Sequence, residues 1–186
     1  MSETIGKTIS PGMGKAMSET SSRTDSDIPM VRVDFKLNGA PASVEVEPCE
    51  MLIDVLREKL QLKGTKRSCD VQVCGACTVL VDGNPTSSCT TLCADAHERE
   101  VTTIEGLAQG KRLDPVQRAF IAHGALQCGF CTPGMILAVK SMLARYDNPT
   151  EETVRHYLRG NICRCTGYVK ILEAIMDLIS NPHNYQ

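Results

Sequence analysis

Hydrophobic and polar residues alternate from Val31 to Val46, a pattern typical of β-strands that bury one face. The apolar positions of the two runs are Val31, Val33, Phe35 and Leu37, followed by Ala42, Val44 and Val46. Between the runs stands Asn38-Gly39, a pair favoured in two-residue turns because both residues tolerate a positive φ. The segment therefore predicts a β-hairpin.

The period of the apolar residues changes after Pro48. Helical spacing over Leu52, Val55, Leu56 and Leu60 predicts a helix that stops before Gly64. Further short strands are predicted at Thr78–Val81 and Val101–Ile104, with Asp82–Pro85 as the turn after the first of them. A hairpin, a helix and more strands predict an α+β sheet domain.

Beyond Gly110 the alternation disappears and helical spacing takes over. Four segments carry apolar stripes, which contain Val116, Ala119, Phe120 and His123; Met135, Val139, Met142 and Leu143; Val154, Tyr157 and Leu158; and Ile171, Leu172, Ile175, Leu178 and Ile179. Asp114-Pro115 and Thr132-Pro133 have the residue types preferred at a helix cap and first turn. Four short helices with brief connections predict an all-α four-helix bundle.

These patterns divide the chain into three parts. Residues 1–29 are rich in Ser, Thr, Gly and Lys and have almost no hydrophobic periodicity, so we expect a disordered tail. Residues 30–108 form the predicted sheet domain and residues 112–182 the predicted helical domain. The boundary falls near residues 106–113, where two glycines and two basic residues interrupt both patterns.

Charge and hydropathy exclude two classes of partner. The net charge of −2 and the scattered basic residues give no field for a nucleic acid. No apolar run approaches the roughly 20 residues of a membrane-spanning helix, and the N-terminus lacks an apolar signal core, so we expect a cytoplasmic protein. Ten cysteines in a reducing compartment favour metal or cluster ligation over disulfides.

The first group of cysteines has the spacing C-x4-C-x2-C-x11-C and consists of Cys69, Cys74, Cys77 and Cys89. Three thiolates on one loop and a fourth from a neighbouring strand are the plant-type arrangement for a 2Fe-2S cluster. Gly75 lets the backbone curl around the cluster. The alternative, a four-cysteine zinc site, usually pairs two short knuckles instead of placing three ligands on one loop.

The second group has the spacing C-x2-C-x31-C-x-C and consists of Cys128, Cys131, Cys163 and Cys165. Both pairs lie between predicted helices and can meet at one end of the bundle. Their spacing alone leaves zinc and an iron–sulfur cluster equally open, because zinc is also held by two short cysteine pairs. Candidate donors to the sulfur atoms are Asn161, Arg164 and Thr166, each of which could equally be an ordinary loop or cap residue.

The strings CDVQVCGACTV with a following SC, then LQCGFCTPGMI and GNICRCTGY, resemble the small iron–sulfur subunit of the molybdenum hydroxylases, the xanthine oxidase family. The resemblance covers about residues 30–180 and all eight motif cysteines in order. It implies a β-grasp ferredoxin-like domain and a helical domain, with one 2Fe-2S cluster in each. It also implies two partners: a large subunit with a molybdenum–pterin cofactor (molybdopterin) and a medium subunit with FAD.

The same resemblance implies an electron-transfer subunit without catalytic residues of its own, in a heterotrimer or its dimer. The eight cysteines would be cluster ligands, and Gln127 would contact the pterin beside Cys128. Substrate selectivity would lie in the large subunit. The chain departs from the family pattern at Ser68, where relatives usually have glycine, and at Val71 and Val73, which make the first loop bulkier and predict an altered local geometry.

Two other functions compete with this interpretation. A diffusing ferredoxin-type carrier would use the same first motif but would not require a helical domain, and a two-zinc structural module would use the same thiols. Cys49 and Cys93 lie outside both motifs and receive no ligand role. The four histidines have no metal-site spacing, and we expect His123 to be a satisfied buried imidazole. Met135 and Met142 are expected in the core.

Overall fold

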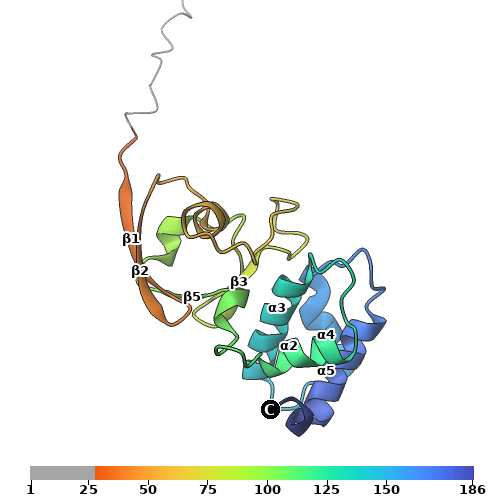
Figure 1. The fold of residues 1–186 in the computed structure, drawn as a ribbon. Helices are drawn as coiled ribbons and strands as arrows, with labels where there is room; N and C mark the ends of the chain where they lie inside the picture. Colours follow the sequence, from red (N-terminus) through yellow and green to blue (C-terminus); the bar gives the residue numbers. More distant parts are fainter. Residues whose placement is uncertain (1–27) are drawn as a thin grey trace, which may run out of the picture.

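The computed structural model describes residues 28–186. The predicted disordered tail, residues 1–29, lies almost entirely outside this described range. Figure 1 shows a β-sheet on one side and a group of helices on the other, joined along one contact surface. The two predicted kinds of structure therefore occur in the predicted order along the chain.

Five short strands form one mixed sheet in the order β2-β1-β5-β3-β4. Their bounds are Val31–Leu37 (β1), Ala40–Val46 (β2), Thr78–Val81 (β3), Asn84–Ser87 (β4) and Glu100–Thr102 (β5). Strands β1 and β5 are parallel, and the other neighbours are antiparallel. The predicted hairpin is confirmed, with Leu37 opposite Ala40 and a turn at Asn38 and Gly39 between them.

The turn after β3 is shorter than predicted. Val81 lies opposite Asn84, so Asp82 and Gly83 alone make the connection, both with positive φ (50° and 75°). These values fit the type I′ turn that matches the twist of a hairpin. The predicted turn residue Pro85 lies instead in β4, which is an edge strand and tolerates the missing N–H.

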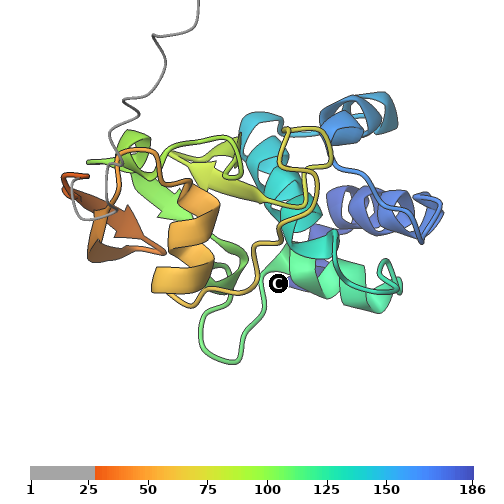
Figure 2. The same ribbon diagram turned by 90° about the horizontal axis from the view of Figure 1, so that it is seen from above.

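The helix predicted after Pro48 is present but is only partly α-helical. Leu52–Asp54 (α1) make an α-turn, and Val55–Lys59 continue as a π-helix in which the Leu60 N–H donates to the Val55 carbonyl at 2.9 Å. The turn still buries its apolar side, and Figure 2 shows it in orange in front of the sheet. Spacing alone does not separate the two helix types because both keep this side inward.

The strand predicted at Val101–Ile104 ends earlier, at Thr102, and a 3-10 turn at Ile104–Gly106 follows. The Thr103 N–H donates to the Asn38 side-chain oxygen at 2.8 Å, and the Asn38 amide donates to the Thr103 hydroxyl at 3.0 Å. Thr103 thus bonds to a side chain of the first turn instead of to a neighbouring strand, which ends the sheet there.

Four α-helices in the second half pack around a common core. They are Pro115–Ala122 (α2), Thr132–Arg145 (α3), Glu151–Tyr157 (α4) and Val169–Ser180 (α5). The Asp114 cap is confirmed: its carboxylate accepts from the Val116 N–H at 3.0 Å, and Gln117 completes a capping box. Met135 and Met142 are fully buried, as predicted.

The two halves of the molecule pack through α3, which lies against β3 and the β3–β4 turn. The Ser141 hydroxyl donates to the Gly83 carbonyl at 2.7 Å, and Arg145 donates to Asn84. The sheet core and the helical core remain separate clusters of buried side chains. The contact surface therefore joins two self-contained cores.

Candidate metal centres

The first cysteine group lies on two segments of the sheet domain, close to the helices. Cys69, Cys74 and Cys77 lie on the loop that leads into β3, and Cys89 follows β4. Cys77 and Cys89 are buried at 2% and 4% exposure, whereas Cys69 and Cys74 are half-buried. The Cys74 N–H donates to Cys69 Sγ, and both the Cys89 and Cys74 thiols lie near enough to Cys77 to add to the rise in its pKa that burial causes.

The backbone of this loop takes three left-handed residues, Asp70, Gln72 and Gly75, with φ of 55°, 59° and 68°. Val71 and Val73 alternate with them and are 64% and 57% exposed. The β-branched residues thus avoid positive φ, which their side chains disfavour, and project outward. The side chains of Val71 and Val73, predicted to alter the loop geometry, therefore lie on its solvent side.

Amide groups of the loop point at sulfur. The N–H groups of Val73 and Cys74 donate to Cys69 Sγ at 3.4 and 3.5 Å. Hydrogen bonds from Val71, Cys74 and Val73 hold the pKa of the Cys69 thiol at about 6. Burial raises the pKa of Cys77 to about 11, so this thiol stays protonated unless a metal takes the proton's place.

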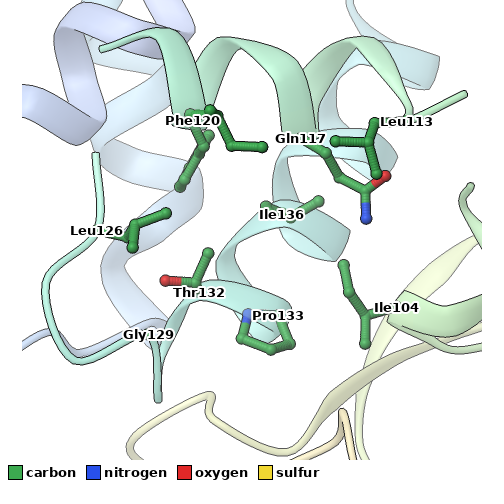
Figure 3. A pocket seen from close by; sticks show the side chains of 10 residues that line it. Ile104, Leu113, Gln117, Phe120, Leu126, Gly129, Thr132, Pro133 and Ile136 are labelled. Atoms are coloured by element: carbon green, nitrogen blue, oxygen red, sulfur yellow. The ribbon is translucent and has the colours of Figure 1, made fainter. Parts of the chain in front are cut away.

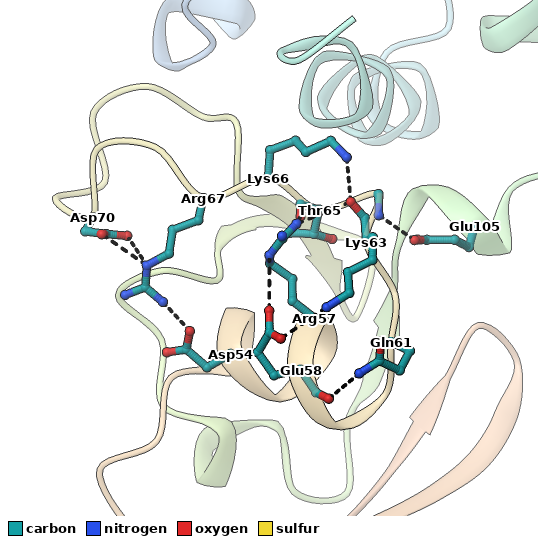
Figure 4. A network of polar contacts seen from close by, with 11 residues as sticks. Asp54, Arg57, Glu58, Gln61, Lys63, Thr65, Lys66, Arg67, Asp70 and Glu105 are labelled. Atoms are coloured by element: carbon teal, nitrogen blue, oxygen red, sulfur yellow. Dashed lines mark hydrogen bonds and ion pairs between the residues drawn. The ribbon is translucent and has the colours of Figure 1, made fainter.

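A network of polar contacts holds the segment that leads into this loop (Figure 4). Arg57 donates to the Thr65 carbonyl at 2.7 Å, and the Gly64 N–H donates to the Glu105 carboxylate at 2.7 Å. Arg67 bridges the carboxylates of Asp54 and Asp70. These contacts hold the segment before Cys69 and the residue after it, so the protein itself helps to position the loop.

The second cysteine group lies where two helical connections meet. Cys128 and Cys131 stand between α2 and α3, and Cys163 and Cys165 stand between α4 and α5. Cys128 Sγ and Cys165 Sγ are 3.6 Å apart, close to the roughly 3.8 Å expected for two thiolates about 2.3 Å from one tetrahedral metal. All four cysteines of this group line one cavity. The predicted meeting of the two pairs is confirmed.

Two hydroxyl groups organise the Cys163 side of this group. The Thr166 hydroxyl and N–H donate to Cys163 Sγ at 3.2 and 3.4 Å, and the Tyr168 hydroxyl accepts from the Cys163 N–H at 2.8 Å. Burial alone would raise the pKa of Cys163, but the Thr166 bonds bring it down to about 7. Burial and the Cys163 thiol raise the pKa of Cys131 to about 12.

Of the three candidate donors to sulfur, only Thr166 bonds to a cysteine of the second group. Thr166 bonds to a cysteine, as the spacing suggested, and Arg164 is exposed. Asn161 bonds instead to the first cysteine loop, through the Gly75 carbonyl. The expected contact of Asn161 with the second group's sulfur atoms is therefore replaced by one with the first loop, and Tyr168 is a contact that the sequence did not indicate. Both contacts depend on how the loops fold back on their neighbours.

The donor set fits a pair of two-iron centres. All ten cysteines are free thiols, and each motif brings four of them to one region of the fold. Four cysteine thiolates are the ligand set of a 2Fe-2S centre. Across residues 28–186, no three His, Cys, Asp or Glu side chains converge on a single point.

The remaining candidates take varied positions. Gln127 is exposed beside Cys128. Cys93 is fully buried in the sheet core, whereas Cys49 is exposed. His123 is satisfied by Asp177 and Tyr185 at 3.0 Å each, but its side chain is 25% exposed and so less buried than predicted.

An open apolar pocket of about 240 Å³ borders the Gln127 segment (Figure 3). Leu126 and Gly129, on either side of Gln127 and Cys128, line this pocket together with Phe120 and Ile136. The segment that carries the predicted pterin contact therefore lies at the edge of an exposed apolar hollow.

Two family models match the chain. One, described as a 2Fe-2S iron-sulfur cluster binding domain, covers residues 37–123, and the other, described as a 2Fe-2S binding domain, covers residues 103–176. The chain is 41% identical over 154 residues to the nicotinate dehydrogenase small FeS subunit of Eubacterium barkeri, covering 83% of this chain and 98% of that protein. It is 44% identical over 149 residues to the xanthine dehydrogenase iron-sulfur-binding subunit of Escherichia coli O157:H7, covering 79% and 93%.

A solved structure agrees with these relatives. The crystal structure of quinoline 2-oxidoreductase from Pseudomonas putida 86 matches with a TM-score of 0.78 and 47% identity over 80% of this chain and 91% of that chain. The fold and the two thiol groups define an iron–sulfur protein of the 2Fe-2S class. Within that class, the chain belongs to the family of small iron–sulfur subunits of the molybdenum hydroxylases. No helix among residues 28–186 has the length and hydropathy to cross a membrane.

Proposed function

We propose that this chain is the electron-relay subunit of a heteromeric molybdenum hydroxylase. It would connect the molybdenum–pterin centre of a large subunit with the FAD of a medium subunit. Cys69, Cys74, Cys77 and Cys89 would hold one 2Fe-2S cluster, and Cys128, Cys131, Cys163 and Cys165 would hold the other. When bound, these clusters supply one-electron redox chemistry at potentials that the surrounding protein tunes.

One observation carries this proposal: the two thiol groups are direct neighbours. A cavity of about 290 Å³ is lined by all four cysteines of the second group and also by Cys74 of the first. The Ile162 N–H, next to Cys163, donates to the Cys74 carbonyl at 2.9 Å. Two carriers held on loops that touch in this way are placed for electron exchange, a placement that two independent structural zinc sites would not require.

The residues of this chain would position the clusters and exclude water. Burial of Cys77, Cys89 and Cys163 shields one side of each thiol group. The amide and hydroxyl donors at Cys69 and Cys163 stabilise negative charge on those sulfur atoms, which favours thiolate ligation. We assign no catalytic residue to the chain.

Exposed apolar side chains near both thiol groups support contact with partner subunits. Such residues are Val71 and Val73 near the first group and Leu126, Phe130 and Ile162 near the second. Large apolar side chains gathered in this way mark interaction surfaces. We assign the exposed Gln127 to the pterin of the large subunit, and the surface around Val71 to the FAD subunit, in a heterotrimer or its dimer.

We also propose the finer fold assignment: a β-grasp ferredoxin-like domain over residues 30–108 and a four-helix-bundle domain over residues 112–182. The mixed sheet with a helical turn across it supports the first, and the shared core of α2–α5 supports the second. Ten free thiols favour a reducing compartment, and we propose the cytoplasm.

Affinity purification of the tagged chain from its native host tests this function. We expect two further polypeptides in constant ratio, one with molybdenum and one with FAD, and sequencing the large one would identify the substrate class. A brown monomer that undergoes reversible redox without partners would instead support a diffusing ferredoxin. A colourless protein with two zinc ions would support a structural module.

A further inference from the structure

A single backbone hydrogen bond joins the two cysteine groups. The Ile162 N–H donates to the Cys74 carbonyl at 2.9 Å. Cys74 belongs to the first group, and Ile162 directly precedes Cys163 of the second. The path from Cys74 Sγ to Cys163 Sγ therefore crosses one hydrogen bond and otherwise runs only through covalent bonds.

Two glycines allow the backbones to approach closely enough for this bond. A Cβ atom at Gly75, which has a φ of 68°, would overlap the Gly160 carbonyl oxygen. A Cβ atom at Gly134, in the first turn of α3, would overlap the Gly75 carbonyl oxygen. Both overlaps involve backbone atoms, so a side chain at either glycine would force the first loop away from the helical half.

Asn161 holds the same contact from the helical side. Its side chain is buried, and its amide donates to the Gly75 carbonyl at 3.2 Å and to the Thr78 hydroxyl at 3.4 Å. Asn161 directly precedes Ile162, and its partner Gly75 directly follows Cys74, so this contact lies beside the Cys74–Ile162 hydrogen bond. A buried asparagine could simply be a satisfied polar group, but this one has its partners on the opposite cysteine loop.

We propose that Asn161 is a positioning residue for electron exchange between the two centres. Together with Gly75 and Gly134 it holds the two loops so that the Cys74–Ile162 hydrogen bond is kept, and this bond connects the two thiol groups directly through the backbone. The inference rests on the proposed relay function and deepens it. It concerns how well the two centres are coupled, not whether they form.

The test uses the complex purified with its partner subunits, carrying Asn161→Ala in this chain. Three quantities are measured: iron per chain, hydrogen exchange of the peptide that contains the Ile162 amide, and the spin–spin splitting in electron paramagnetic resonance when both clusters are reduced. We expect about four irons per chain, exchange of Ile162 faster by about tenfold because the loop loses two buried hydrogen bonds, and a smaller splitting.

Ser141→Ala is the matched control. It also removes a hydrogen bond between the two halves, to Gly83, but away from the cysteine loops. Unchanged exchange and splitting in this control, with both altered in Asn161→Ala, support the proposal. Equal values of exchange and splitting in the two variants would overturn it.

Gly134→Ala provides a second variant that changes no residue next to a cysteine. If Asn161→Ala loses iron, hydrogen exchange and spin–spin splitting are measured in Gly134→Ala instead. Its added methyl group displaces the Gly75 carbonyl directly, so faster exchange and a smaller splitting support the proposal, and unchanged values overturn it. Iron below four per chain in the unaltered complex would count against the relay function itself. That result differs from unchanged exchange and splitting in the variants, which would count only against the positioning role of Asn161.

Discussion

Single side chains hold the two thiol groups in place. Cys128 Sγ and Cys165 Sγ lie 3.6 Å apart where two helical connections meet. The Asn161 amide donates to the Gly75 carbonyl of the first cysteine loop, and the Tyr168 hydroxyl accepts from the Cys163 N–H. These contacts depend on how the loops fold against each other.

Replacing one predicted ligand should remove one cluster. In Cys165→Ser we expect iron to fall from about four to about two per chain, because the centre that uses the Cys128–Cys165 pair loses a thiolate. Electron paramagnetic resonance of the reduced variant should show one of two signals missing. Cys49→Ser, at an exposed cysteine outside both motifs, should keep both signals. Two unchanged signals in Cys165→Ser would refute the ligand assignment.

Asp177 predicts a pH dependence of stability. Hydrogen bonds from Tyr185, Asn181 and His123 lower its pKa from the ordinary 3.8 to about 2. The ionised carboxylate is therefore stabilised by the fold, and this contribution is full above about pH 4 and is lost as the pH falls toward 2. Asp177→Asn should melt at a lower temperature than the unaltered chain at pH 7, with a difference that shrinks below pH 4. A difference that stays constant with pH would contradict this role.

At the scale of elements, the patterns with a strong period were predicted well and their ends poorly. The first hairpin and α2–α5 occur where expected, because alternation, caps and prolines act locally. The π-helix at Val55–Lys59 and the early end of β5 escaped prediction. The end of β5 depends on a partner distant in sequence, since Thr103 bonds to Asn38, whereas apolar spacing does not separate a π-helix from an α-helix. In the site, the spacing of the cysteines predicted that their two pairs meet, but the contact of Asn161 with Gly75 depends on tertiary packing that no local pattern encodes.

The cap of α2 should contribute measurably to stability. Asp114→Ala removes the carboxylate that accepts the Val116 N–H and also pairs with Lys140, so we expect the free energy of unfolding to fall by about 1 kcal/mol. Asp114→Asn keeps the capping oxygen and should lose less. Chemical denaturation followed by far-ultraviolet circular dichroism compares the two, and equal losses would show that the cap itself contributes little.

At the scale of the whole molecule, the two thiol groups meet at the contact surface between the sheet and the helices. The patterns of single elements do not predict this meeting. This meeting depends on close backbone approach at Gly75 and Gly134, which a sequence without its fold does not specify. The resemblance of the motif strings implied two clusters in one chain. The structure adds which loops touch and which side chains lie between them.

Exposed apolar residues at the first loop should make the chain associate when it is produced without its partners. Val71 and Val73 are more than half exposed, and we expect light scattering to report oligomers or aggregates of the isolated chain. Val71→Thr with Val73→Thr keeps the side-chain shape and should reduce association. Equal association of both forms would place the responsible surface elsewhere.

The central claim is that eight thiolates of this one chain hold two separate two-iron centres. Reductive titration of the purified complex, with iron and acid-labile sulfide quantified and electron paramagnetic resonance recorded at each step, tests it most directly. The account predicts about four irons and four sulfides per chain and two distinct signals. About two irons with a single signal, or zinc in place of iron, would contradict it.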